Sequence, residues 1–433
     1  MIKIKFNKII PYLSILFLVS SCSSTSAVRL LKAKSTNLSY NLSSLNEEYF
    51  ASKEKADSFE LKFNEAYLNK FDDGVSNLAI SPYSVFMSLG MLYETANNNS
   101  AKEILDALSM SENELRNFSS FSYRLSNKEK YSSNDNKLIL REKLLNSIWI
   151  NEGFNPKEEA LTNLSNYYFA DSYEAQFYTN NKQANKDLTK YISDETYKFL
   201  EPDLKISEYA KIVLMNLLYL KTAWGNLDLN LTLNECDFLN SNLSTTKKKF
   251  IVGKYQTGRV LEKDSYRAFY NKSDSGYRLY FIVPNINQKL KDVYNYQIIN
   301  EIRSYDYSSV NNENVSYFTK CIFPSFSAES DNDIKDLMRE SFNIKECMDK
   351  DLADLSKISD TKLYVNDYKH IAKLNVDEKG IEGAAVTVIS GDATSAGRGE
   401  NIVYETFLVD RSFAYILEDP YQNILFSGVV NSI

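Results

Sequence analysis

The chain has 433 residues and the composition of a globular protein, with 43% hydrophobic and 25% charged residues, 13 glycines and 7 prolines. This length permits a large hydrophobic core, in one large domain or in two smaller ones. The formal net charge is −7, and the sequence has no basic stripe interleaved with aromatic residues, which argues against a nucleic-acid partner.

The N-terminus is typical of an export signal. Three lysines in the first eight residues precede the apolar run IIPYLSILFLVSS, which is too short to span a bilayer. The run ends in Val19-Ser20-Ser21-Cys22, which resembles the bacterial lipoprotein signal, whose cysteine is lipidated and becomes the mature N-terminus. We therefore expect a signal peptide over residues 1–21 and a membrane anchor through a lipid on Cys22. The protein would be exported and held at the cell surface or the periplasmic face; cleavage near Ser21 without lipidation would instead release it as a secreted protein.

Residues 22–46 are rich in Ser and Asn and offer little to bury, so we expect a tether there. No repeat, Pro-rich linker or charge block divides residues 47–433, which predicts a single domain.

Two helices are expected early in this domain. Ala56–Lys70 places Phe59, Phe63 and Tyr67 four residues apart, as in an amphipathic helix. Ser81–Ala96 begins with Ser-Pro, a helix-start signal, and is apolar nearly all round, which predicts a core helix.

Strand-like segments dominate the second half of the chain. Lys143–Ile150 and Lys211–Leu220 come first, and the second is apolar on both faces, which indicates a central strand covered on both sides. Further strands are expected over residues 277–284, 316–326, 404–410, 413–419 and 423–430. Helices early and strands late predict an α+β fold with large sheets.

Asn216 interrupts the apolar run IVLM-N-LLYL. A buried amide without a partner costs about 1–3 kcal/mol, so Asn216 must meet another polar group. His370 is the one histidine of the chain, and no GxSxG, HExxH, GxxxxGK[ST] or GxGxxG motif is present, so we do not expect an enzyme.

Three cysteines remain beyond Cys22, namely Cys236, Cys321 and Cys347. None has CxxC spacing or a nearby histidine, which leaves little support for a metal or redox site. We interpret them as small buried hydrophobes and expect no metal and no cofactor.

Several motifs, in order, resemble the serpin family from about Ala56 to Ile433. They are NLAISPYSVFMSLGMLYETANNNSAKEILDAL, LNSIWINEGF, VLMNLLYLKTAW, IFPSF, ADLS, DEKGIEGAA and the terminal FLVDRSFAYILEDPYQNILFSGVVN. The resemblance implies helices packed on large mixed sheets, with an exposed reactive-centre loop that can insert into the main sheet.

The resemblance also assigns roles to polar residues. It implies a hydrogen-bonded "shutter" formed by Ser81, Ser84, Asn216 and His370, and it places Trp224 under the end where the sheet opens, called the breach. It places the reactive-centre loop at about residues 378–402. The hinge of that loop falls on Glu378, Lys379, Gly380, Ile381, Glu382, Gly383, Ala384 and Ala385.

By the same resemblance, a protease attacks the loop, and the cut loop enters the main sheet as a new central strand. The residues suit this role, because no proline lies between Gly380 and Arg398 to interrupt a ladder of hydrogen bonds. Alternation would place one set of side chains on each face, with Glu382 on a face that can be solvated. One face would carry Ile381, Gly383, Ala385, Thr387 and Ile389, and the other Glu382, Ala384, Val386, Val388 and Ser390.

This chain departs from the family pattern at a few positions. Ile381 stands where inhibitory members usually have Thr or Ser. Thr222 and Thr95 replace glycines, and Asn98 replaces a turn glycine at a position where asparagine tolerates left-handed geometry.

Inhibitory members are cut roughly seventeen residues along from the hinge glutamate. Counted from Glu378, this gives Thr394-Ser395, a bond suited to elastase-like or subtilisin-like proteases. Arg398-Gly399 is the trypsin-like alternative, and its four extra residues add about 13 Å of slack to the inserted strand.

We therefore expect a monomeric suicide-substrate inhibitor of a serine endopeptidase, with cysteine proteases as a further candidate class. The alternative is a non-inhibitory serpin-fold binding protein that is cleaved as a plain substrate, an interpretation that Ile381 favours. The acidic net charge argues against a heparin-like activating cofactor.

Overall fold

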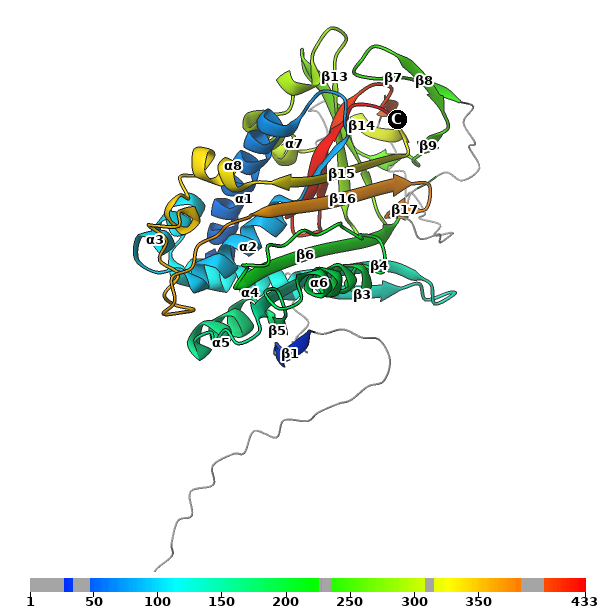
Figure 1. The fold of residues 1–433 in the computed structure, drawn as a ribbon. Helices are drawn as coiled ribbons and strands as arrows, with labels where there is room; N and C mark the ends of the chain where they lie inside the picture. The colour runs from blue at the N-terminus through cyan, green and yellow to red at the C-terminus, as the bar shows by residue number, and fades with distance from the viewer. Residues whose placement is uncertain (1–26, 34–46, 226, 228–234, 308–314, 383–400) are drawn as a thin grey trace, which may run out of the picture.

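The computed structural model describes residues 27–33, 47–225, 227, 235–307, 315–382 and 401–433 (Figure 1). The expected signal peptide, the expected lipidation site at Cys22, hinge residues 383–385 and both candidate bait bonds lie outside the described residues. The remaining chain folds into helices packed around three larger sheets and a two-stranded ribbon.

An eight-stranded sheet, here called the large sheet, forms the front of the molecule in Figure 1. Its strand order is β1-β5-β4-β6-β17-β16-β15, and β3 pairs with β4. The strands are β1 (Val28–Leu31), β3 (Lys128–Tyr131), β4 (Leu138–Asn151), β5 (Asp171–Ala175), β6 (Ile212–Ala223), β15 (Phe326–Asp333), β16 (Lys369–Asp377) and β17 (Gly380–Ile381).

Two further sheets hold the remaining long strands. A six-stranded sheet has the order β11-β12-β13-β19-β20-β2, and a four-stranded sheet has the order β10-β14-β18 with β9 also on β14. The six strands are β2 (Leu78–Ile80), β11 (Leu261–Glu262), β12 (Tyr266–Lys272), β13 (Arg278–Pro284), β19 (Phe413–Glu418) and β20 (Ile424–Val430). The four are β9 (Phe250–Val252), β10 (Gln256–Thr257), β14 (Val315–Pro324) and β18 (Asn401–Leu408); the ribbon joins β7 (Cys236–Leu239) to β8 (Thr245–Lys248).

The helices cover both faces of the large sheet, with α2 behind it and α6 in front of it in Figure 1. Ser81 and Pro82 start α2 as the sequence predicts, because the Ser81 side chain accepts a hydrogen bond from the Ser84 amide and Pro82 takes the first position. The helices are α1 (Glu47–Phe71), α2 (Pro82–Thr95), α3 (Asn98–Leu108), α4 (Glu112–Ser126), α5 (Glu158–Tyr167), α6 (Asn181–Glu195), α7 (Tyr296–Ser304) and α8 (Lys335–Ser341), with short 3-10 turns at Leu290–Asp292 and Glu346–Met348.

The α+β prediction is confirmed, and the expected elements fall where the apolar patterns place them. The segment Lys211–Leu220 is the core of β6, which lies inside the large sheet. The expected helix over Ala56–Lys70 is part of the longer α1, and Phe59, Phe63 and Tyr67 are buried in it. Asn98 has φ +46°, the left-handed geometry expected of it.

The expected tether over residues 22–46 is wrong for residues 28–31, which form β1 at the edge of the large sheet. β1 pairs antiparallel with β5, and Arg29 donates a hydrogen bond of 2.6 Å to the Tyr173 hydroxyl and forms an ion pair of 3.2 Å with Asp171. The Ala33 amide donates to the same carboxylate at 2.7 Å. Composition alone missed this strand because its stability comes from the unpaired edge of β5, which lies 140 residues away or more in the chain.

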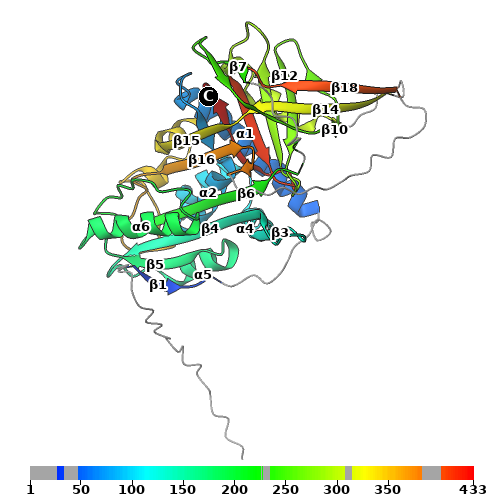
Figure 2. The ribbon, with the colours of Figure 1, turned by 90° about the vertical axis from the view of Figure 1, so that its right-hand side faces the viewer.

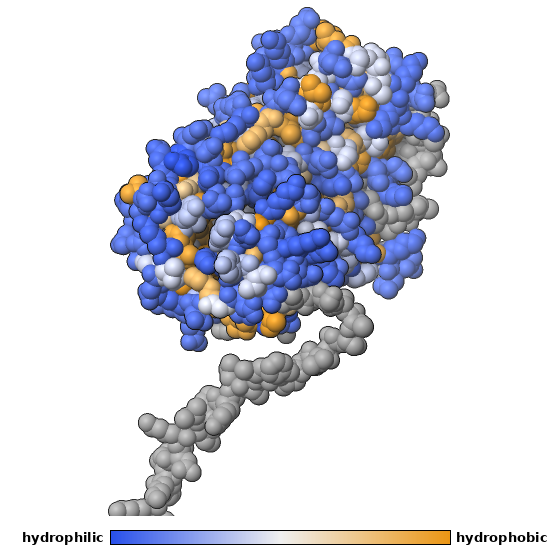
Figure 3. Space-filling view, viewed as in Figure 1, coloured by the Kyte–Doolittle hydropathy of each residue, from blue (hydrophilic) through white to orange (hydrophobic). Residues whose placement is uncertain are grey.

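The surface is mostly hydrophilic on the face shown in Figure 3, where apolar residues form small separate groups. Within the described part of the chain, no helix is both long and apolar enough to cross a membrane. In Figure 2, β1 lies at the opposite end of the molecule from β18, and in both ribbon views it lies opposite β14, with which β18 pairs (Figures 1 and 2).

Candidate functional site

The large sheet is parted between β6 and β16, and the short strand β17 occupies one end of the parting. Gly380 and Ile381 pair with Ala223 and Thr222 of β6 on one side, and with β16 on the other. β17 is antiparallel to both neighbours, so β6 and β16 run in the same direction. Beyond β17, no ladder joins β6 to β16 in the described part of the sheet.

A tight turn after β16 sends the chain back into the sheet. The Asp377 carboxylate accepts hydrogen bonds from the amides of Lys379 at 2.8 Å and Gly380 at 3.1 Å, which fixes the turn. The indole of Trp224 donates to the Asp377 carbonyl at 2.7 Å, so the residue assigned to the breach binds the base of the hinge.

Gly380 is required by a close approach of two backbones. A Cβ at this position would lie 2.3 Å from the Thr222 carbonyl oxygen, a distance that no side chain can accept. The residue type at 380 therefore allows β17 to lie against β6.

Ile381 is fully buried and belongs to the main core, so the residue that departs from the family pattern is an apolar anchor in this structure. It lies opposite Thr222, whose buried hydroxyl has no hydrogen-bond partner among the described residues. A Thr or Ser at 381 would offer that hydroxyl a partner, whereas Ile381 offers only packing.

Glu382 is the last described residue in the first part of the reactive-centre loop. Its carboxylate accepts a hydrogen bond of 2.6 Å from the Tyr219 hydroxyl and forms an ion pair of 3.0 Å with Lys221. The side chain is only 7% exposed. The expectation that Glu382 lies on a face that can be solvated concerns the inserted strand and stays a prediction; in this structure the two β6 side chains cover the carboxylate.

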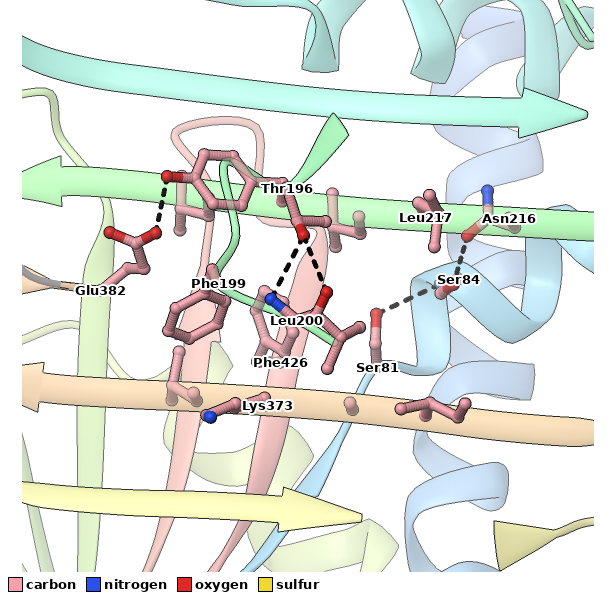
Figure 4. Close-up of a pocket in the computed structure, with 16 residues that line it drawn as sticks. Ser81, Ser84, Thr196, Phe199, Leu200, Asn216, Leu217, Lys373, Glu382 and Phe426 are labelled. Carbon is pink, nitrogen blue, oxygen red and sulfur yellow. Dashed lines mark hydrogen bonds between the residues drawn. The ribbon is translucent and has the colours of Figure 1, made fainter. Parts of the chain in front are cut away.

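The rest of the parting is closed by side chains and not by a strand. Figure 4 shows Phe199 and Leu200, from the connection after α6, between β6 and β16, with Phe426 of β20 in the same gap. The Thr196 hydroxyl holds this connection by accepting from the Leu200 amide at 3.2 Å. Only about 30 Å³ of the gap remains unfilled, so an entering strand must displace Phe199 and Leu200.

Ser81, Ser84, Asn216 and His370 lie together at the far end of the parting, in two linked pairs. The Ser81 amide donates to His370 Nε2 at 3.2 Å, and the Ser84 hydroxyl donates to Asn216 Oδ1. The Ser84 amide joins the pairs through Ser81 Oγ at 3.4 Å. Their role as a shutter stays a prediction, but Asn216, which is partly buried, has the polar partners that its place in an apolar run led us to expect.

A further asparagine extends this network, and the sequence reasoning missed it. Asn216 Nδ2 donates to Asn146 Oδ1 at 2.7 Å, and Asn146 Nδ2 donates to the Tyr168 carbonyl at 2.6 Å. Asn146 interrupts an apolar run in β4 just as Asn216 does in β6, and the two lie directly opposite each other. The same sequence signal would have found both.

Burial determines the protonation of His370. Burial lowers the pKa of the imidazole from 6.5 to about 4, and Nε2 acts as a hydrogen-bond acceptor, so the ring is neutral at pH 7. The rings of Phe63 and Tyr67 pack edge-on against it. The histidine is thus a structural acceptor in the core.

Two of the three cysteines are buried, as the sequence predicts. Cys321 and Cys347 are fully buried, and burial raises the pKa of both thiols, that of Cys347 to about 12. Cys236 is half-buried at the start of β7. Among the described residues, no group of three or more His, Cys, Asp or Glu side chains is arranged to hold a metal ion.

Solved structures with a similar fold include serpins. The native thermophilic serpin tengpin matches 94% of this chain and 100% of its own, with a TM-score of 0.73 and 23% identity. Thyroxine-binding globulin in complex with thyroxine has a TM-score of 0.70 at 18% identity, over 88% of this chain and 99% of its own.

Sequence comparisons agree. A serpin-like protein of Methanosarcina acetivorans is 23% identical over 363 residues, covering 82% of this chain and 81% of its own length, and mouse neuroserpin is 24% identical over 370 residues, covering 82% and 85%. The family model described as serpin (serine protease inhibitor) matches residues 58–433. The chain therefore belongs to the serpin family, whose members are generally protease inhibitors and not enzymes.

Proposed function

We propose that this protein is a single-use inhibitor of serine endopeptidases that acts by loop cleavage and insertion. The observation that carries the proposal is β17, two residues of the loop base already paired between β6 and β16. The parting beyond it is filled by side chains and not by a strand, so the cut loop can enter once Phe199 and Leu200 are displaced.

The register of β17 supports the role of the loop sequence. Ile381 lies opposite Thr222 and Val376, so a strand continuing in this register would bring Thr387 opposite both Asn216 and His370. A small hydroxyl residue would then meet the polar network at the end of the parting. Because pleating places every second residue on the same face, Thr387 would share the inward face with the buried Ile381.

The same register favours Thr394-Ser395 over Arg398-Gly399 as the bait bond. Continued pairing would place Gly391 opposite Ile212, the first residue of β6. A protease acylated by Thr394 would lie three residues beyond the end of β6, about 10 Å, whereas one acylated by Arg398 would lie about 23 Å beyond it. The shorter tether would pull the protease against the body of the inhibitor, so we expect cuts at Arg398 to be partly substrate-like.

The test is to incubate the exported chain with elastase, subtilisin and trypsin and to separate the products on denaturing gels. We expect a stable band with the summed mass of protease and cut chain, and a new C-terminus at Thr394 by mass spectrometry. Complete cleavage by all three proteases without such a band would reject inhibition of these classes.

A non-inhibitory binding protein is the second candidate, and the full burial of Ile381 is the observation that favours it. An apolar anchor that already fills the entry to the sheet would slow further insertion. This candidate predicts cleavage without a covalent complex and without a gain in heat stability.

We also propose that the protein is exported and anchored through a lipid on Cys22. Only five residues separate Cys22 from Val28, the first residue of β1, so the lipid would hold the β1 edge within about 20 Å of the membrane. The Cys22→Ser variant should then leave the membrane fraction and appear in the soluble one. An unchanged distribution of this variant would reject the anchor.

A further inference from the structure

Glu382, the residue after β17, has an unusual backbone conformation. Glu382 has φ +70°, in the left-handed region that favours glycine and disfavours other residues. Its amide nevertheless donates a hydrogen bond of 2.7 Å to the Asn375 carbonyl of β16. This is the bond that the next rung of an extended strand would make, since Ile381 lies opposite Val376.

The side chain of Glu382 makes two strong contacts with β6. One carboxylate oxygen accepts from the Tyr219 hydroxyl at 2.6 Å, and the other lies 3.0 Å from the Lys221 ammonium. Glu382 and Lys221 are 7% and 22% exposed, so water screens the pair only partly. We call Glu382, Tyr219 and Lys221 the hinge clasp.

The hinge clasp matches the register of an inserted strand. Because Ile381 lies opposite Thr222, the residue opposite Lys221 in the same register is Glu382. Insertion would therefore rotate the Glu382 backbone from left-handed to extended while the carboxylate kept its cross-strand partner. A slip by one residue would turn Glu382 toward the inward face, where Leu220 and Leu374 are buried and offer no cation.

We propose that Glu382 is a positioning residue, which holds the loop base at a depth of two residues before cleavage and fixes the register in which the cut loop enters. This inference rests on the proposed function for the step after cleavage, but the hinge clasp itself can be tested in the uncut protein. We expect substitutions at residue 382 to weaken the hinge clasp by different amounts. Glutamine keeps an acceptor for the Tyr219 hydroxyl and loses the ion pair with Lys221, whereas alanine loses both.

The first test measures hydrogen–deuterium exchange of the amides of residues 380–382 in the uncut chain. Glu382→Ala should raise their exchange rates by about tenfold or more, and Glu382→Gln and Lys221→Met by less. Lys369→Met is the matched control, because it removes a lysine from an exposed ion pair of 3.4 Å with Asp331 in the same sheet. Equal exchange rates in Glu382→Ala and the wild type would overturn the hinge clasp, whether or not the protein inhibits a protease.

The second test separates loop recognition from insertion in the reaction with a protease. Glu382→Ala should raise severalfold the number of inhibitor molecules consumed per protease trapped, while the rate constant of loop cleavage stays unchanged. If Glu382 had only a structural role, Glu382→Ala would lower the rate constant of loop cleavage, or it would leave the number of inhibitor molecules consumed per protease trapped unchanged. Either result would overturn the positioning role. If the wild-type chain traps no protease at all, the proposed function fails, and the exchange experiment still decides whether the hinge clasp exists.

Discussion

The indole Nε1 of Trp224 donates a hydrogen bond of 2.7 Å to the main-chain carbonyl of Asp377, and so joins the end of β6 to the end of β16. These two ends flank β17, and the ring of Trp224 is buried against Phe323. The contact closes the side of the sheet where the loop base enters.

Trp224→Phe should therefore loosen the hinge more than it perturbs the core. Phenylalanine keeps most of the apolar contact and leaves the Asp377 carbonyl without its partner, a loss of about 1 kcal/mol. We expect a slightly lower thermal midpoint and faster hydrogen exchange at residues 378–381. Unchanged exchange at these residues would show that the hydrogen bond does not hold the hinge.

Gly380→Ala tests whether β17 needs its close approach to β6. The added Cβ would lie 2.3 Å from the Thr222 carbonyl, so β17 should leave the sheet and expose Ile381. Exposing this side chain would cost about 2 kcal/mol. Rapid exchange of the amides at 380 and 381 is the expected readout. Gly153→Ala is the matched control, since its φ is also positive, at +75° against +157° for Gly380, and a Cβ there meets nothing within 4 Å.

Asn146 and Asn216 should behave as a coupled pair. Asn216→Leu leaves Asn146 Oδ1 and the Ser84 hydroxyl without their partner, and we expect the free energy of unfolding to fall by about 2 kcal/mol. In a double-mutant cycle with Asn146→Leu, the double variant should lose less than the sum of the single losses. Strict additivity in denaturant unfolding would show that the two amides do not depend on each other.

His370 makes stability depend on pH in the acidic range. Its pKa is about 4 when folded and near 6.5 when unfolded, so between these values the unfolded chain binds more protons. The contribution of His370 to the free energy of unfolding is therefore fully present above pH 6.5. It is lost as the pH drops toward 4, which lowers the free energy of unfolding by about 3 kcal/mol.

The check is to compare His370→Gln with the wild type across this range. Glutamine can accept the Ser81 amide and has no proton to gain, so the wild type should lose more of its thermal midpoint than the variant between pH 6.5 and pH 4. Parallel pH profiles for the two proteins would contradict the assignment.

The sequence predicted those elements whose own pattern determines them. α2 begins at Ser81-Pro82 because the cap and the first helical position are local features, and β6 is central because both of its faces are apolar. Asn216 was recognisable as a residue in need of a partner, since a polar amide in an apolar run is a local signal too.

The features that the sequence did not predict depend on distant parts of the chain. The alternation of side chains along a strand predicts which face of the sheet Glu382 would lie on. It does not predict the Tyr219 hydroxyl and the Lys221 ammonium that cover the carboxylate. The same holds for Phe199 and Leu200, which carry no periodic signal and fill the parting only because the connection after α6 passes between β6 and β16.

The central claim is that the cut loop enters the large sheet, and the most direct measurement is the thermal midpoint of the chain before and after cleavage at Thr394-Ser395. A new strand with about ten ladder hydrogen bonds should raise the midpoint by about 10–20 °C. An unchanged or lower midpoint after this cut would show that the loop stays outside the sheet and would contradict the account.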